Sequence, residues 1–266
     1  MQRSKIITLL TDFGQQDGYV AAMKGVILGL HPNANLIDLT HEVEPQNVQA
    51  GAFLLQTHFR CFPVGTVHLA VVDPGVGSAR AALAGRAAGH FFVAPDNGLL
   101  DFCLDLSERQ VVRLTQNKFW REPVSSTFHG RDIFAPVAAH LARGELLQNL
   151  GELFQLQRRL PAFETRLVGK TLRGQVVYID RFGNLISNIS AQQLREFSRD
   201  QPITISLAEH LIGGLCQTYA EVPPDSPLAL IGSFGFLEIG VNRGNARRRF
   251  DARPGDPVNI ELGQII

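Results

Sequence analysis

Cysteine is scarce in this sequence. Three cysteines occur in 266 residues, far apart and without a Cys-x-x-Cys pair. Their odd number and spacing argue against a disulfide framework and a zinc site, so no structural metal is expected. Cys61, Cys103 and Cys216 are predicted to be small core residues in a reducing, cytoplasmic environment.

A surplus of one charge is also lacking. Lys plus Arg and Asp plus Glu each number 25, so the net charge is 0 at pH 7. Without a basic field the protein is not expected to bind nucleic acid or an anionic membrane, and a small neutral or zwitterionic ligand is the easier partner.

Long hydrophobic runs are missing too. Near the N-terminus the only apolar run is at residues 6–10, too short for the core of a signal peptide. No segment approaches the roughly 18 apolar residues of a membrane span. Hydrophobic residues nevertheless make up 45% of the chain. This share and the length predict a globular intracellular protein of one large or two ordinary domains.

Residues 1–160 alternate between two hydrophobic periodicities. Short apolar runs read as buried strands, and apolar residues repeated every three to four positions read as one face of a helix. This alternation predicts an α/β domain with a central, mostly parallel sheet flanked by helices. The strand runs are 6–10, 36–39, 69–73, 91–94 and 111–114; the helical segments are 19–30, 47–59 and one that has Asp132 as its N-cap or first-turn acid.

The helical periodicity mostly disappears in the second part of the chain. Residues 151–170 change character, and residues 161–170 are predicted to be a linker. Residues 171–266 carry short runs divided by Gly, Pro, Asn and Asp, with one short helix at 191–197, and predict an all-β, barrel-like domain. The runs are 176–179, 185–189, 203–207, 219–222, 228–231, 236–241 and 258–262.

Polar residues gather at the predicted carboxyl ends of strands in the first domain. The run at 69–73 rises to Asp73, and a tight Pro-Gly-Val-Gly turn brings Arg80 back beside it. Asp12 follows the first strand, and His129 lies at a loop-to-helix junction. Open α/β sheets bind ligands at this edge, although an isolated Asp-Pro-Gly is also ordinary turn chemistry.

Two chemistries fit these residues. Asp12, Asp73 and His129 could bind a divalent metal, as in a phosphohydrolase; alternatively, Asp73 and His129 handle a proton while other groups hold a ligand. Arg80 and Arg131 weigh against the metal, because guanidinium groups oppose the positive charge that such a site must collect.

Six motifs resemble those of one enzyme family. They run in family order along nearly the whole chain: TDFG at 11–14, VDPGVGS at 72–78, PDNGLL at 95–100, FHGRDIFAP at 128–136, DRFGNLISNI at 180–189 and SFGFLEI at 233–239. The chain thus resembles the S-adenosyl-L-methionine hydroxide adenosyltransferases, the water-using relatives of the S-adenosylmethionine-dependent fluorinase and chlorinase. The resemblance implies an α/β domain, a β-barrel, and a homotrimer with sites between one subunit's N-terminal domain and its neighbour's C-terminal domain.

The resemblance also implies a reaction without a cofactor or metal. S-adenosylmethionine is hydrolysed to adenosine and L-methionine by water that attacks C5′ of the ribose. The family's Asp–Arg–His triad falls on Asp73, Arg80 and His129. Asp73 is expected to hold and polarise the water, His129 to be its hydrogen-bond partner and the favoured proton acceptor, and Arg80 to fix the carboxylate and stabilise developing hydroxide. Which of the three takes the proton stays open at this point. Methionine leaves as a neutral thioether, so only the water needs help.

Two alternatives to hydrolysis remain open. Halogenases of this superfamily have a tyrosine where Asp73 stands, and a carboxylate there would repel a halide. Phe234 likewise differs from the arginine of the halogenases. The second alternative is a sensor that binds adenosine or S-adenosylmethionine without significant turnover.

The resemblance implies binding roles for two residues of the first domain. Asp12 matches the carboxylate that accepts hydrogen bonds from the ribose hydroxyls, and Asp17 matches an acidic group near the methionine ammonium. Asp12 could instead be a turn residue and Asp17 the N-cap of the following helix. Asp96 and Asn97 are interpreted mainly as a structural turn.

The resemblance implies further binding roles in the barrel. Asp180 matches a second acidic group near the ammonium, Asn184 the amide that reads adenine, Phe182 an apolar wall, and Ser233 a contact to the methionine carboxylate. Glu238 is included as a binding residue, although in an alternating strand it could simply face solvent. The loop around Asn184 could also be an ordinary hairpin turn.

Overall fold

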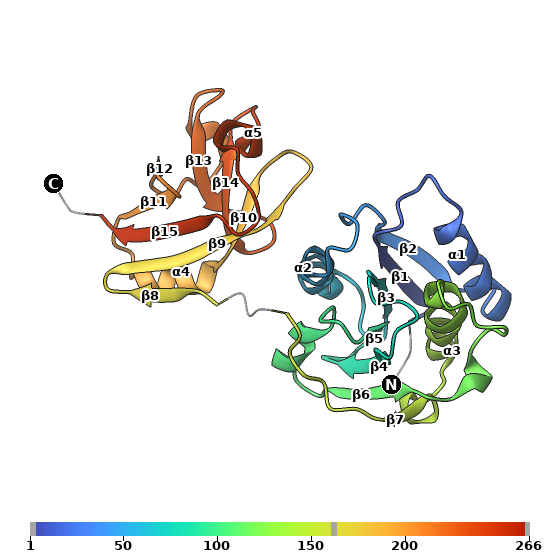
Figure 1. Cartoon of the computed structure of the whole chain (residues 1–266). Coiled ribbons are helices and arrows are strands. Elements are labelled where there is room, and N and C mark those ends of the chain that lie inside the picture. Colours follow the sequence, from blue (N-terminus) through green and yellow to red (C-terminus); the bar gives the residue numbers. More distant parts are fainter. Residues whose placement is uncertain (1–3, 161–163, 264–266) are drawn as a thin grey trace. The chain divides into compact units, whose positions relative to one another are not determined.

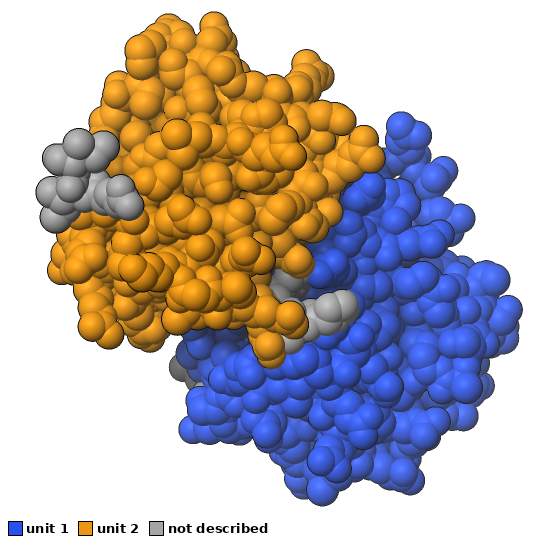
Figure 2. Space-filling model, turned by 60° about the vertical axis from the view of Figure 1, so that its left-hand side comes forward, with its two compact units in different colours: residues 1–161 blue, residues 162–266 orange. Residues whose placement is uncertain are grey.

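The computed structural model describes residues 4–160 and 164–263. The chain divides into two compact units, residues 1–161 and residues 162–266 (Figure 2). Each unit has its own sheet and hydrophobic core. Within the described residues, the helices are all too short or too polar to cross a membrane.

Unit 1 is built on a seven-stranded mixed sheet with the order β2-β1-β3-β5-β4-β6-β7 (Figure 1). β1 pairs in parallel with β2 and β3, and β3 with β5, whereas β4 is antiparallel to β5 and β6, and β6 to β7. The predicted mostly parallel sheet is therefore correct only for the β2-β1-β3-β5 half. The strands are β1 Ile6–Thr11, β2 Asn35–Thr40, β3 Val67–Val71, β4 Ala82–Ala87, β5 His90–Pro95, β6 Gln110–Leu114 and β7 Gly151–Leu153.

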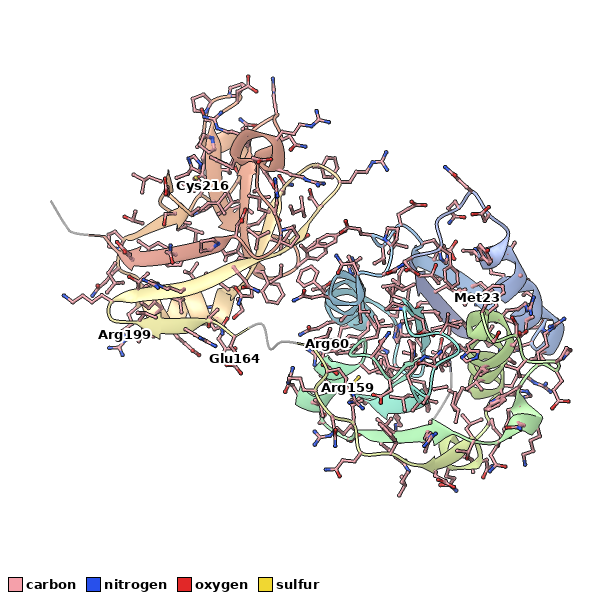
Figure 3. All side chains as sticks on the ribbon, in the orientation of Figure 1. Met23, Arg60, Arg159, Glu164, Arg199 and Cys216 are labelled. Carbon is pink, nitrogen blue, oxygen red and sulfur yellow. The ribbon has the colours of Figure 1, made fainter. Side chains whose placement is uncertain are left out.

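Three helices cover the sheet of unit 1. α1 (Tyr19–Leu30) and α3 (Ala135–Arg143) lie on one face, and α2 (Val48–His58) lies on the other (Figure 1). Met23 of α1 is fully buried in the core that the sheet shares with α3 (Figure 3). Short helical turns complete the unit: η1 Phe59–Cys61, η2 Asp101–Asp105, η3 Asn117–Phe119, the π-helical η4 Gly130–Phe134 and η5 Leu147–Asn149.

Unit 2 is a nearly closed antiparallel barrel. Its strand order is β12-β11-β15-β9-β10-β14-β13, with β8 paired to β9. Leu215, just after β12, bridges to Ala229 in β13, which brings the two ends of the sheet together and agrees with the predicted barrel. The strands are β8 Arg166–Val168, β9 Thr171–Ile179, β10 Leu185–Ser190, β11 Ile203–Leu207, β12 His210–Gly213, β13 Pro227–Ile231, β14 Phe236–Val241 and β15 Pro257–Leu262, and the helices are α4 Ala191–Ser198 and α5 Ala246–Phe250.

Two segments of unit 2 differ from their predicted conformation. β8 lies inside the segment predicted as a linker, whose residues 161–163 are outside the described residues. The strand predicted at 219–222 is instead a 3-10 turn, η6 (Tyr219–Glu221). Thr218 and Glu221 form a reciprocal capping box around it, and this local arrangement outweighs the β propensity of Tyr219 and Val222.

The cysteines differ in their surroundings. Cys103 is buried, as predicted, whereas Cys61 is exposed and Cys216, between β12 and η6, is half-buried (Figure 3). The prediction of a core position is therefore wrong for Cys61.

Candidate active site

Asp73, Arg80 and His129 form one connected group at the carboxyl edge of the sheet. Arg80 Nε donates to Asp73 Oδ1 at 2.9 Å, and its Nη2 donates to Asp73 Oδ2. The same Nη2 donates to His129 Nδ1 at 2.9 Å. The side chains of Asp73 and Arg80 are only 4% and 10% exposed. A bidentate pair that is shielded in this way holds both groups in one orientation.

The turn between Asp73 and Arg80 depends on close backbone packing. Val76 N donates to Asp73 O at 3.2 Å, which starts the turn directly after β3. Gly77 has φ +78°, and a Cβ there would lie 2.4 Å from the carbonyl oxygen of Ser126. Only glycine fits this position. The close approach of Gly77 to Ser126 brings the segment before His129 against the turn.

The predicted turn at residues 95–98 also supports the end of β3. Asn97 Nδ2 donates to Val72 O at 2.7 Å, immediately before Asp73. Asp96 accepts from Arg159 Nη2 at 2.8 Å. These contacts agree with the interpretation of Asp96 and Asn97 as structural residues.

His129 is held by the helical turn that begins beside it. Asp132, predicted to cap the helix, lies inside η4 and is fully buried; it accepts from Arg131, from Arg121 and from the backbone N–H of Ser125. Of the two predicted positions of Asp132, that of N-cap is wrong, because the helical segment starts earlier, at Gly130, and that of first-turn acid is confirmed. Asp132 instead fixes the segment that carries His129.

The electrostatics of the group define the protonation of His129. Burial, and then the positive charge of Arg80, hold the pKa of His129 below its usual value of 6.5, against the opposing charges of Asp73 and Asp132. A guanidinium can only donate, so Nδ1 of His129 must accept. At neutral pH the imidazole is therefore neutral, with its proton on Nε2.

Asp12 lies at the same edge of the sheet as Asp73. Thr11 and Val71 are paired in the β1–β3 ladder, so the residues that follow the two strands share that edge. Asp12 Oδ2 accepts from the backbone N–H of Gln46 at 2.8 Å. Its partner belongs to another loop, so Asp12 is more than a local turn residue.

Asp17 is exposed, and the structure does not place it in the group around Asp73. The N-cap of α1 is Gly18, so the alternative role of Asp17 as N-cap is wrong. The loop that carries Asp17 is tied to the segment before His129 by an aromatic cluster: Phe128 contacts Phe13 and Tyr19, with ring centroids 5.9 and 5.2 Å away.

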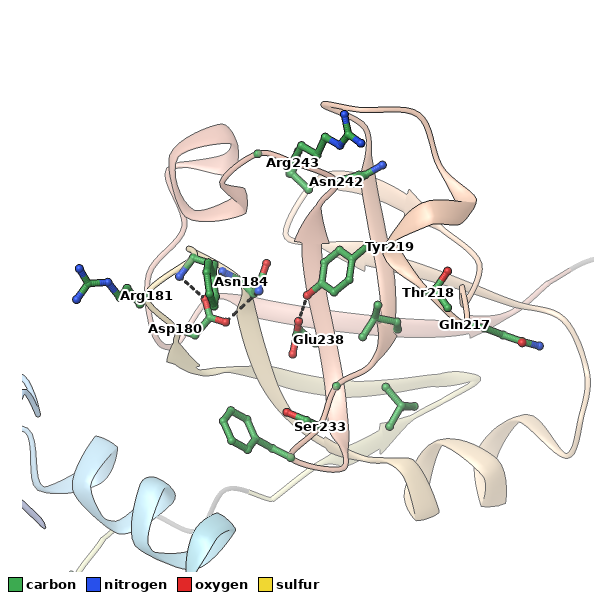
Figure 4. A pocket seen from close by; sticks show the side chains of 17 residues that line it. Asp180, Arg181, Asn184, Gln217, Thr218, Tyr219, Ser233, Glu238, Asn242 and Arg243 are labelled. Atoms are coloured by element: carbon green, nitrogen blue, oxygen red, sulfur yellow. Dashed lines mark hydrogen bonds between the residues drawn. The ribbon is translucent and has the colours of Figure 1, made fainter. Parts of the chain in front are cut away.

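The five predicted binding residues of the barrel line one cavity of about 840 Å³ (Figure 4). Asp180 organises its loop: Oδ1 accepts from the backbone N–H groups of Phe182 and Asn184, and Oδ2 accepts from Asn184 Nδ2. Phe182 is 74% exposed, and Asn184 is buried. Ser233 is exposed and also lines the cavity (Figure 4).

Glu238 is buried in this cavity wall and does not face solvent. Its Oε1 accepts from the hydroxyl of Tyr219 (Figure 4). Burial, and then the charge of Asp180, raise the pKa of Glu238 against the opposing hydrogen bond. Tyr219 is absent from the predicted binding residues; the capping-box pattern Thr218–Glu221 was the signal that could have placed it in a loop facing the cavity.

The arrangement of acidic, histidine and cysteine side chains bears on the metal hypothesis. Across residues 4–160 and 164–263, groups of three or more His, Cys, Asp and Glu that could hold a metal ion do not occur. Both oxygens of Asp73, the central residue of the metal hypothesis, accept from Arg80 instead.

Comparison with known proteins gives the chain a family. Residues 7–151 match the family described as SAM hydroxide adenosyltransferase N-terminal domain, and residues 174–259 match the C-terminal domain of the same name. The chain is 38% identical over 261 residues to the (R)-S-adenosyl-L-methionine hydrolase of Salinispora tropica, covering 97% of this chain and 98% of that protein. It is 26% identical over 297 residues to a fluorinase of Nocardia brasiliensis, covering 98% of both.

Solved structures agree with this relationship. The uncharacterized conserved protein from Thermotoga maritima superposes with a TM-score of 0.89 at 34% identity, covering 96% of this chain and 99% of that one. Both domains of one family thus match in order along most of the sequence, and the relatives match over almost their full length. The chain belongs to the SAM hydroxide adenosyltransferase family.

Proposed function

We propose that this protein hydrolyses S-adenosyl-L-methionine to adenosine and L-methionine. The observation that carries the proposal is the connected group of Asp73, Arg80 and His129 at the carboxyl edge of the sheet, in a chain that is 38% identical to a protein named (R)-S-adenosyl-L-methionine hydrolase. In the name of the Salinispora tropica relative, "L" already specifies the α-carbon, so we assign the prefix (R) to the sulfonium sulfur and propose the same epimer here.

The reaction needs a positioned water and little else. A bond forms between the water oxygen and C5′, the C5′–S bond breaks, and its electron pair leaves with methionine as a neutral thioether. No acid has to protonate that leaving group. The water loses one proton, which a carboxylate within reach can accept. Holding the water in line with the C5′–S bond supplies much of the remaining acceleration.

The hydrogen bonds of the triad assign these tasks. Because Nδ1 of His129 already accepts from Arg80 and Nε2 carries the proton, His129 has no free basic nitrogen in this arrangement. We therefore assign proton acceptance to Asp73 and make His129 a positioning residue for Arg80, which differs from the role that the sequence suggested for His129. Arg80 holds the carboxylate in one orientation through its two hydrogen bonds to Asp73.

The substrate must also contact the barrel cavity, because the five family-matched binding residues lie there. We propose that a neighbouring subunit of a homotrimer supplies this cavity to each triad, as the family resemblance implies. Light scattering on the purified protein should give a mass about three times the 29.2 kDa of one chain. A mixture of Asp73→Asn and Asn184→Ala subunits should regain activity, since some hybrid sites would carry neither change.

Two substitutions test the chemistry. Asp73→Asn should lower the rate of adenosine release by about 10²–10⁴-fold, the usual contribution of positioned acid–base help, with binding of S-adenosylmethionine retained. Asp105→Asn is the matched control, because the side chain of Asp105 is 70% exposed and belongs to the same unit. Adenosine release is measured by chromatography with each sulfonium epimer as substrate. The measurement is repeated with a chelator, which should leave the rate of adenosine release unchanged.

The role of His129 has its own test. In His129→Asn the amide oxygen can take the place of Nδ1 as acceptor for Arg80, whereas His129→Ala removes the acceptor. A positioning role predicts that Asn restores part of the activity that Ala loses. An equal loss of activity in both variants would instead indicate that His129 accepts the proton. Binding without adenosine release by the unmodified protein would identify a sensor, and a 5′-halogenated product with chloride or fluoride would identify a halogenase.

A further inference from the structure

One segment of unit 1 holds both ends of the turn at residues 73–80, which carries two of the three triad residues. At the start of this turn, Val72 O accepts from Asn97 Nδ2 at 2.7 Å. At its end, Ala81 O accepts from the backbone N–H of Asp96 at 2.9 Å. Two consecutive residues therefore fix the points at which the 73–80 turn leaves the sheet and returns to it.

The contact from Asn97 is made where the pairing of the strands has ended. In β3 the pairing with β1 ends at Val71, and the pairing with β5 ends at Leu69. Val72 is fully buried, so its carbonyl oxygen needs a donor from the protein. The side chain of Asn97 supplies the donor that the sheet does not. Its Oδ1 accepts from the backbone N–H of Leu99 at 3.3 Å, which turns Nδ2 toward Val72.

The other end of the 73–80 turn is connected directly to the guanidinium group of Arg80. Ala81 O, which accepts from Asp96, also accepts from Arg80 Nη1 at 3.3 Å. The remaining donors of this guanidinium group reach Asp73 and His129. A displacement of either end of the turn would therefore change how Arg80 meets Asp73.

The segment that holds the turn is itself held by residues 158–160. Asp101, which is only 4% exposed, accepts through Oδ2 from the backbone N–H groups of Arg159 and Leu160 at 2.7 and 2.8 Å. Its own backbone N–H donates to Gly98 O at 3.0 Å. Gly98 has φ +108°, and a Cβ there would lie 2.4 Å from Leu160 Cγ. Asn97 thus projects from a well-fixed backbone, as a group that positions another must.

We propose that Asn97 is a positioning residue for the reaction: its hydrogen bond to Val72 O sets the direction in which the carboxylate of Asp73 leaves the sheet. The inference rests on the proposed function. It gives Asn97 a task beyond forming a turn, and the two tasks use different atoms. The turn needs only the acceptor Oδ1, whereas positioning needs the donor Nδ2.

Two variants of the full chain separate these tasks. Asn97→Asp keeps an acceptor for the backbone N–H of Leu99 but has no donor for Val72 O, and Asn97→Ala lacks both without adding a charge. Initial rates of adenosine release at several concentrations of S-adenosylmethionine give kcat and KM. Both variants should lower kcat about 10- to 100-fold, because a displacement on the order of 1 Å at the reacting groups costs this much. KM should stay within about twofold, since Asn97 is not assigned a contact with the substrate.

The control is Asn33→Asp, the same chemical change on an exposed turn of unit 1, which should leave kcat unchanged. If circular dichroism shows that Asn97→Ala does not fold, Asn97→Ser takes its place, because its shorter, uncharged side chain keeps an acceptor for the turn.

Four results would overturn the inference. A loss of kcat in Asn97→Ala alone would assign Asn97 to the turn, and a loss in Asn97→Asp alone would be an effect of the added charge. An unchanged kcat in both variants would make the contact with Val72 irrelevant to the reaction, and a rise in KM without a fall in kcat would make Asn97 a binding residue. In each case the unmodified protein still releases adenosine; its failure to do so would refute the proposed function instead.

Discussion

The buried histidine cluster of unit 1 should make this unit sensitive to mild acid. His68 in β3 is fully buried, with Nδ1 2.8 Å from the hydroxyl of Thr8 and Nε2 3.1 Å from Nδ1 of His90. Its ring stacks on Phe92, with the centroids 5.2 Å apart and the planes at 25°. Burial, and then the nearby His90, lower the pKa of His68 from 6.5 to about 3.

The size of the effect follows from proton linkage. Between pH 6.5 and pH 3 the unfolded chain binds a proton at His68 that the folded unit rejects, so stability falls as the pH is lowered through this range. Each pH unit of this window is worth about 1.4 kcal/mol. At pH 5 the loss from His68 alone is therefore about 2 kcal/mol relative to pH 7.5. His90, whose pKa burial also lowers, adds to the loss in the same direction.

Urea unfolding at pH 7.5 and pH 5 measures this loss. Trp120 is the only tryptophan of the sequence and lies in unit 1, so its fluorescence reports the unit that contains the cluster. His68→Gln keeps an amide that can hydrogen-bond to Thr8 and His90 but cannot take up the proton. The unmodified protein should lose about 2 kcal/mol more than this variant between the two pH values.

Two results would refute this reasoning. One is an equal loss of stability in the unmodified protein and in His68→Gln, which would show that the folded unit accommodates the charged ring. The other is a loss of stability between the two pH values that is as small in His58→Gln as in His68→Gln. His58 lies at the end of α2, outside the cluster, so this substitution is a control. That control should instead retain the response of the unmodified protein.

Two further predictions concern the segment that carries His129. Because burial and Arg80 lower the pKa of His129, kcat should stay level from pH 8 down to 6.5 and fall only below that value; a fall centred above pH 6.5 in a pH–rate profile would contradict the neutral imidazole. Asp132→Asn leaves Arg131 and Arg121 without their buried carboxylate. Both arginines reach solvent, so the free energy of unfolding of unit 1 should fall by about 1–3 kcal/mol, less than for the loss of a fully buried ion pair. Urea unfolding followed by Trp120 fluorescence measures this change. An unchanged unfolding midpoint would show that Asp132 does not fix this segment.

Hydrophobic patterning predicted the parallel half of the sheet and, in the antiparallel half, the run that is β6, but it missed β4 and β7. The runs that became β1, β2, β3 and β5 are rich in β-branched and large apolar residues, and each is recognisable on its own. β4, ALAGRA, consists mainly of alanine and glycine, which disfavour strands, and pairing with β5 and β6 overrides this propensity. Its hairpin turn is Ala88–Gly89, both with positive φ, and alanine gives no turn signal.

The candidate site was predictable to the extent that it is local or carried by family motifs. Asp73 and Arg80 are seven residues apart, and a glycine turn suffices to bring them together. His129 is 49 residues from Arg80; its position before a helix suggested that it belongs to the site, but its contact with Arg80 could not be derived from local sequence. Tyr219 belongs to no motif of the resemblance, and its contact with Glu238 arises from the path of the chain around the barrel, which periodicity does not encode.

In the proposed mechanism, the hydrogen bonds among Asp73, Arg80 and His129 are compatible with a carboxylate that is already paired to arginine and still accepts a proton. Water attacking a carbon that bears a sulfonium keeps both protons until the C–O bond has largely formed, and the protonated alcohol that results is strongly acidic. A strong base is then unnecessary, and what matters is an acceptor fixed at the right place when the proton is released. Arg80 provides that fixation through two hydrogen bonds to Asp73, and Nδ1 of His129 accepts a third hydrogen bond from the same guanidinium group. Replacement of Arg80 by lysine, which retains the charge but loses the fork, would therefore remove the geometry on which Asp73 depends.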